Sequence, residues 1–87
     1  MTKSQAESLH EDVLFVRRTY HKSLQYILEA DPADKERLRQ LRVLHNASVE
    51  ALMTVHSVIS LKRQEAIQHK DHRTVGMMDG LLFVLKG

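Results

Sequence analysis

The chain has no cysteine and no tryptophan, and its 87 residues include one proline, three glycines, two tyrosines and two phenylalanines. Without cysteine it forms neither disulfides nor cysteine-ligated zinc sites. So little proline and glycine leaves few turns. A content of 43% apolar residues with few aromatic ones is typical of helices rather than strands. We therefore predict an all-α fold.

Long uninterrupted apolar runs are also missing. The least charged stretch, residues 43–61, has the length of a membrane span and carries one formal charge, Glu50. It also holds His45, Asn46 and His56, and placing this polar load at the centre of a bilayer costs too much free energy. We therefore predict no membrane span and no membrane partner.

The length and charge set further bounds. A chain of 87 residues is one domain, of a size that is marginally stable alone and often gains stability by association. Residues 1–36 carry five basic and seven acidic side chains, and residues 37–87 carry eight and four, an asymmetry too mild to indicate nucleic acid by itself. The first sixteen residues lack the apolar core of a signal peptide, so we expect a cytoplasmic protein.

The pattern predicts a first helix over about residues 4–30. Ser4 and Glu7 have the spacing of a capping box, in which each side chain satisfies a free backbone N–H at the helix start. Apolar residues then recur at spacings of three and four, which average near the helical 3.6. They are Ala6, Leu9, Val13, Val16, Tyr20, Leu24 and Ile27.

A second helix is predicted over about residues 32–69. Pro32 suits the first helical position, with Asp31 as the N-cap. The connection to the first helix is then very short, so the two helices form an antiparallel hairpin. The inner face of the second helix is Leu38, Leu41, His45, Ser48, Leu52, Val55 and Ile59.

A short third helix is predicted over about residues 72–86. Between Ile59 and Val75 a straight helix turns by about 160°, which would send the last apolar stripe to the opposite side. A turn near residues 70–73, with Asp71 as a cap, avoids this. Gly76 and Gly80 either permit close approach of another helix or each cost about 1 kcal/mol of helix stability.

The uncharged stretch raises the question of what covers it. A helix that is apolar or neutral on every side is normally buried on every side, and the hairpin covers only part of this one. The simplest completion is a second copy of the protein, giving a four- or six-helix bundle in a dimer or larger oligomer. We predict an interface at Val43, Val49 and Met53, with a second docking surface at Met77, Leu81 and Val84 in the tail. The competing interpretation is a monomeric three-helix bundle with some exposed apolar residues.

Basic residues suggest an alternative function. Arg17 and Arg18 on the first helix and Arg39 and Arg42 on the second would form one patch if an antiparallel hairpin brought them together, and phosphate contacts need only such a patch. Acidic residues are interleaved, however, and exposed aromatic side chains for base stacking are lacking. A small nucleic-acid-binding regulator is therefore the second hypothesis, behind a protein-protein interaction module.

Histidines and carboxylates were the remaining candidates for chemistry. Glu65, His69 and His72 would share one face of a continuous helix near Asp71, but nothing supplies further ligands, so no metal site or cofactor is predicted. His45 and His56 are most simply hydrogen-bonded core residues. If two second helices crossed antiparallel, each His45 would instead approach His56 of the other copy and make a pH-sensitive dimer.

No enzyme signature is present. Serine and histidine neighbours occur, but no nucleophile sits on a strand-to-helix turn and no glycine-rich loop could hold a phosphate. A small helical hairpin also offers no enclosed site for a small-molecule substrate. We therefore predict a non-enzymatic protein.

The last thirteen residues, VGMMDGLLFVLKG, form a short apolar helix with a G-x-x-x-G spacing. Together with the predicted long hairpin, this tail resembles small helical accessory proteins encoded by tailed bacteriophages. The resemblance implies a regulatory protein that binds a host or virion protein, in host takeover or particle assembly. It assigns no role to any individual residue.

Overall fold

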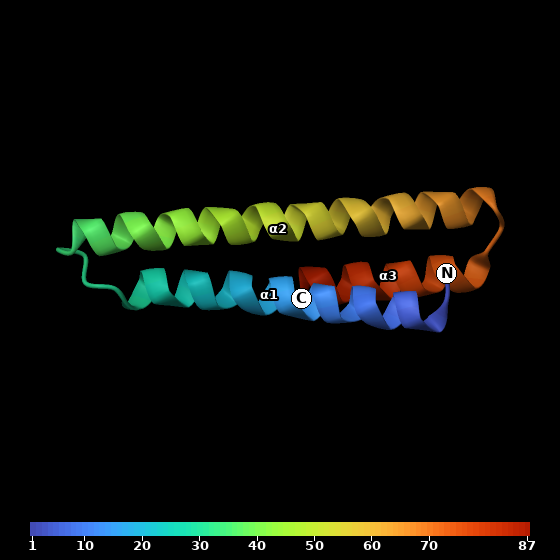
Figure 1. The fold of residues 1–87 in the computed structure, drawn as a ribbon, viewed down its shortest axis with the longest axis horizontal. Coiled ribbons are helices and arrows are strands. Elements are labelled where there is room, and N and C mark those ends of the chain that lie inside the picture. The colour runs from blue at the N-terminus through green and yellow to red at the C-terminus, as the bar shows by residue number, and fades with distance from the viewer.

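The computed structural model describes all 87 residues as three α-helices: α1 (Lys3–Glu29), α2 (Lys35–Gln68) and α3 (His72–Lys86). α1 and α2 form an antiparallel hairpin, and α3 folds back beside α1 against the C-terminal half of α2 (Figure 1). The result is a rod of 55 × 18 × 17 Å. The predicted all-α fold with two long helices and a short C-terminal helix is confirmed. None of the three helices combines the length and the hydropathy needed to cross a bilayer.

The cap of α1 is Thr2, two residues before the predicted cap at Ser4. The Thr2 hydroxyl accepts a hydrogen bond from the Gln5 backbone N–H at 3.2 Å, and the Gln5 side chain accepts one from the Thr2 N–H at 3.0 Å. This is a capping box, and it replaces the predicted Ser4–Glu7 pair. Both pairs have the required spacing, and the earlier one adds two residues to the helix.

The connection between α1 and α2 is a turn followed by a new cap. The Asp31 carboxylate accepts a hydrogen bond from the Ala33 N–H, and the Asp34 N–H donates to the Asp31 carbonyl at 3.0 Å. Aspartate at the first position and proline at the second are favoured in such a turn. Asp34 then caps α2 by accepting from the Arg37 N–H at 3.1 Å. The prediction of Asp31 as the cap was wrong, because Asp31 is used in the turn.

The turn between α2 and α3 confirms the predicted cap at Asp71. The Lys70 backbone is left-handed, with φ of 56°. The Asp71 N–H donates to the Ala66 carbonyl and the Lys70 N–H to the Ile67 carbonyl, which is the Schellman arrangement. Asp71 then accepts from the hydroxyl and the backbone N–H of Thr74. These two hydrogen bonds, the hydroxyl one first, lower the pKa of the Asp71 carboxyl.

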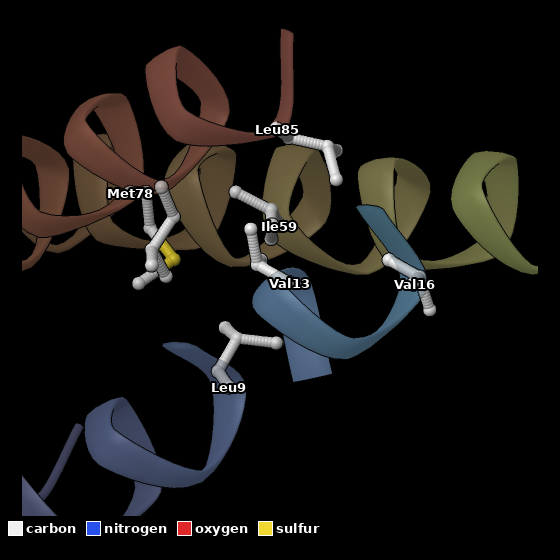
Figure 2. Packing of buried hydrophobic residues seen from close by; sticks show 7 residues of the cluster. Leu9, Val13, Val16, Ile59, Met78 and Leu85 are labelled. Atoms are coloured by element: carbon white, nitrogen blue, oxygen red, sulfur yellow. The ribbon is translucent and has the colours of Figure 1, made fainter. Parts of the chain in front are cut away.

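The hydrophobic core occupies the half of the rod where all three helices meet. Figure 2 shows side chains of α1, α2 and α3 converging there. The buried cluster is Leu9, Val13, Val16, Ile59, Met78, Leu81 and Leu85. Only 12 of the 87 residues are buried, so the hairpin beyond the end of α3 has little apolar core of its own.

Candidate protein interface

α3 covers one face of the hairpin and leaves the opposite face bare. On α2, Arg63 pairs with Asp79 of α3 at 2.5 Å, and on α1 the side chains of Lys3 and His10 line a groove with residues of α3. The side of α2 next to α1 is marked by Ser48, whose hydroxyl lies 3.1 Å from that of Ser23 of α1. No helix covers the face opposite α3, which we call the open face.

The open face of α2 carries a second heptad stripe. Six residues recur at spacings of three, four, three, four and three, the pattern by which one helix packs against another. None of them is charged and none is buried, and Leu61 is 59% exposed. We call this stripe the α2 seam: Leu44, Ala47, Ala51, Thr54, Val58 and Leu61.

α1 contributes the other half of the open face. At helical spacing, its residues on the side away from α3 include Phe15, which is 66% exposed, and Tyr26, which is also exposed. Thr19 lies between them, and Asp12 and Lys22 lie on the same line. Neither charged residue belongs to an ion pair within the chain. The open face therefore carries uncharged, mostly apolar side chains along α2 and both aromatic and charged side chains along α1.

The six predicted interface residues do not form one surface. Val43, 66% exposed, borders the open face, whereas Met53, 64% exposed, lines a hollow at the end of α3. Val49 is half-buried on the same side of α2 as Met53. In the tail, Met77 and Val84 are half-buried along a groove between α1 and α3.

Leu81 requires a correction. It belongs to the core cluster and is 7% exposed, so it is already covered within the chain and is not available to a partner. Its place in the apolar stripe of the tail did not distinguish a residue that packs on the hairpin from one that docks elsewhere.

The sequence pattern missed half of the α2 seam. Beside the inner stripe of this helix, Leu44, Ala51 and Val58 recur every seven residues in the sequence, and none of them is among the predicted interface residues. Ala47, Thr54 and Leu61 complete the seam. The signal was present in the spacing of residues 44–61, but small side chains such as alanine and threonine do not stand out in a hydrophobicity pattern.

The four arginines of the nucleic-acid hypothesis do not form one patch. Ser23 of α1 contacts His45 and Ser48 of α2, and this register sets Arg18 and Arg42 about 15 Å apart along the rod. Arg39 is paired with Glu36 at 2.8 Å. Arg17 is half-buried, and its Nε is buried without a partner. The hairpin does not bring the four arginines together, because Arg17 and Arg18 lie in the middle of α1, whereas Arg39 and Arg42 lie near the start of α2.

A buried polar layer joins the two long helices. Ser23 Oγ lies 2.8 Å from His45 Nδ1 and 3.1 Å from Ser48 Oγ, and the Ser48 hydroxyl donates to the His45 carbonyl at 2.6 Å. The Tyr20 ring packs on the His45 ring, with centroids 5.1 Å apart. A serine and a histidine at this distance resemble an activated nucleophile. Ser23, however, is only 1% exposed, which keeps any substrate away from its hydroxyl.

The two central histidines therefore have different environments. His45 is half-buried in the polar layer, whereas His56 is exposed beside a hollow at the end of α3. Only His45 fits the expectation of a hydrogen-bonded core histidine. Both lie on sides of α2 away from the seam, so a pairing of two seams does not bring His45 to the other copy's His56.

The residues considered for metal binding are separated by the second turn. α2 ends at Gln68, and His72 begins α3, so Glu65, His69 and His72 no longer share one helix face. No group of three or more histidine and carboxylate side chains in the structure is arranged to hold a metal ion.

Comparisons with protein-family models, with curated proteins and with solved structures found no match to this chain. The fold and the open face therefore carry the functional argument by themselves.

Proposed function

We propose that this protein is a non-enzymatic helical interaction module that associates with a second copy of itself through the open face. One observation carries the proposal: the α2 seam has the spacing of a helix-packing stripe, lacks charge and is left exposed by the chain's own helices. A stripe of this kind normally packs against another helix.

The surface area of the single chain supports this proposal. The chain exposes 6472 Å², whereas a compact monomer of 10.1 kDa is expected to expose about 5,300 Å². The radius of gyration is 16.2 Å, compared with about 12 Å for a compact domain of this length. The rod therefore exposes more surface than a compact monomer of its mass, and covering one long face would remove much of the excess.

The open face is also large enough for a stable interface. The rod is 55 Å long and 18 Å wide, so one face has roughly 1,000 Å² of projected area, compared with about 800 Å² per partner in a standard interface. Ala47 and Ala51 lie near the middle of the seam and let two helix backbones approach closely. Glu50 is the one charged residue in the stretch from Val43 to Leu61, and it borders the seam.

The test is the molar mass of the protein in solution, measured by light scattering during size exclusion. We expect the wild type to be a dimer at micromolar concentration and Ala51→Glu to be a monomer with unchanged helix content, because Ala51 is exposed within one chain. Asn46→Glu is the matched control, since it adds the same charge to an exposed position of α2 away from the seam, and it should remain a dimer. A monomeric wild type, or a dimeric Ala51→Glu variant, would overturn the proposal.

A separate experiment tests the alternative function, nucleic-acid binding. Salt-dependent retardation of DNA that is lost on charge reversal at Arg39 and Arg42 would favour it. The separation of the arginines along the rod and the Arg39–Glu36 pair are the reasons for ranking it second. The tail's resemblance to bacteriophage accessory proteins fits the interaction module, because such proteins act mostly by binding other proteins.

A further inference from the structure

We infer that the second copy packs on the open face about a twofold axis perpendicular to the helices, so that each α2 seam runs antiparallel to the other. This inference rests on the proposed self-association and specifies its geometry. The alternative twofold axis runs along the rod and makes the two seams parallel. Side-chain size and charge on the two helices distinguish these arrangements.

The sizes of the seam residues suit an antiparallel pairing. The seam has a leucine at each end, Leu44 and Leu61, and its smallest side chains lie in between. With the axis midway between Ala51 and Thr54, Leu44 packs against Leu61 of the second copy, and Ala51 packs against Thr54 of that copy. Each alanine then faces a larger side chain, Val58 or Thr54, which helps to fill the space beside it as close packing requires, whereas parallel seams would place alanine opposite alanine.

The charges beyond the ends of the seam favour the same arrangement. Within the seam, Leu44, Ala51 and Val58 are seven residues apart. The same spacing reaches Arg37 before them and Glu65 after them. Neither charge is in an ion pair within the chain. In the antiparallel arrangement, Arg37 and Glu65 of the second copy differ in position by only about 5 Å, measured along the helix direction. Parallel seams would instead place Arg37 against Arg37 and Glu65 against Glu65.

α1 gives independent support through its register with α2. Ser23 lies level with the turn of α2 from His45 to Ser48. The middle of the seam is about six residues farther along α2, and therefore level with Arg17 of α1. Asp12 and Lys22 lie five residues on either side of Arg17, and both are exposed on the open face.

The axis derived from the seam therefore places Asp12 level with Lys22 of the second copy, and Lys22 level with its Asp12. Phe15 of one copy and Thr19 of the other, each two residues from Arg17, also lie level with each other across the axis. In the parallel arrangement, an axis along the rod that pairs the two α2 seams places the two α1 helices on opposite sides of them, so Asp12 and Lys22 meet neither their counterparts nor each other. Oppositely charged residues thus meet on both helices only when the axis is perpendicular to the rod.

Disulfide trapping tests the orientation, because the wild type has no cysteine. In the antiparallel dimer two copies of residue 44 are about 26 Å apart, far beyond the reach of a disulfide. We expect Leu44→Cys alone to give no covalent dimer under mild oxidation, and an equimolar mixture of Leu44→Cys and Leu61→Cys chains to give the mixed dimer. Covalent dimers from Leu44→Cys alone would overturn the inference while leaving self-association intact.

Charge reversal tests the register on α1. We expect Asp12→Lys to raise the dimer dissociation constant roughly tenfold, because two symmetric attractions become repulsions. Lys22→Asp should act alike, and the Asp12→Lys/Lys22→Asp double variant should recover the wild-type constant. A parallel dimer would show neither the loss nor the rescue, since Asp12 and Lys22 do not meet residues of the second copy's α1 in that arrangement. A wild type that does not associate at all would instead refute the proposed function.

Discussion

At the scale of single residues, Lys70 is the clearest departure from what its sequence position favours. Its left-handed backbone, with φ of 56°, closes the end of α2, and glycine is the residue usually found there. A side chain with a Cβ pays a steric cost in this conformation. Asp71 follows at once as the cap of α3.

We therefore expect Lys70→Gly to be more stable than Lys70→Ala by about 1 kcal/mol. Both variants remove the same charge, so their difference isolates the backbone cost at this one position. Urea denaturation followed by circular dichroism measures it. Equal midpoints for the two variants would mean that the left-handed turn is not kept in solution.

Ser23 is a second residue with a specific structural role, because its buried hydroxyl holds the polar layer between α1 and α2 together. Its hydroxyl is shared among the Tyr20 carbonyl, His45 and Ser48, so removing it leaves buried polar groups with fewer partners. We expect Ser23→Ala to lower the free energy of unfolding by about 1–2 kcal/mol. Ser57→Ala, at an exposed position of α2 outside the seam, is the control and should cause no loss.

The polar layer also predicts non-additivity between its two serines. Ser23 and Ser48 are in contact, so the Ser23→Ala/Ser48→Ala double variant should cost less than the sum of the single variants. Denaturation of the four proteins under one buffer measures this coupling. Strict additivity would show that the two hydroxyls act independently, and the layer would then be two separate local interactions.

At the scale of elements, α3 contains two glycines that serve no packing purpose within the chain. A Cβ at Gly76 or Gly80 would meet no atom within 4 Å, and both residues are exposed. We expect Gly76→Ala and Gly80→Ala each to raise the free energy of unfolding by up to about 1 kcal/mol. Thermal denaturation with a matched measurement of molar mass checks both stability and association.

The same pair of variants separates the two interpretations of this small-residue flank. Because the proposed interface lies on the face opposite α3, dimerisation should be unchanged in both. A variant that is more stable as a monomer yet associates more weakly would show that α3 itself approaches a partner.

The elements show which parts of the fold could be predicted from sequence. The two turns were found because Pro32 and the 160° shift of the apolar stripe are strong local signals. The exact caps were found less well, because Thr2 and Ser4, or Asp31 and Asp34, offer the backbone chemically equivalent oxygens. Local sequence does not decide which oxygen is used when both positions satisfy the same rule.

The candidate interface was harder to predict than the elements. Val43, Val49 and Met53 were chosen because they fall outside the inner stripe of α2, yet they lie on different sides of the helix. Which side is bare depends on where α3 packs and where it ends, and this is a tertiary property. Leu81 illustrates the same limit, since an apolar stripe looks alike whether it packs on its own chain or on another.

At the scale of the whole molecule, the uneven distribution of the core couples folding to association. Seven core residues gather where three helices meet, while the two-helix half depends on the polar layer and on whatever covers the open face. A partner that binds only the folded chain adds its binding free energy to the stability of that chain. The thermal midpoint of unfolding should therefore depend on protein concentration.

We expect a tenfold rise in chain concentration to raise the unfolding midpoint of the wild type by about 3–5 °C. The Ala51→Glu variant should show no such dependence, because it unfolds as a monomer, and its midpoint should lie below that of the wild type at every concentration. Differential scanning calorimetry over the range from ten micromolar to one millimolar measures both proteins. A wild-type midpoint that does not change across this range would mean that each rod folds and persists alone, with the α2 seam in contact with water.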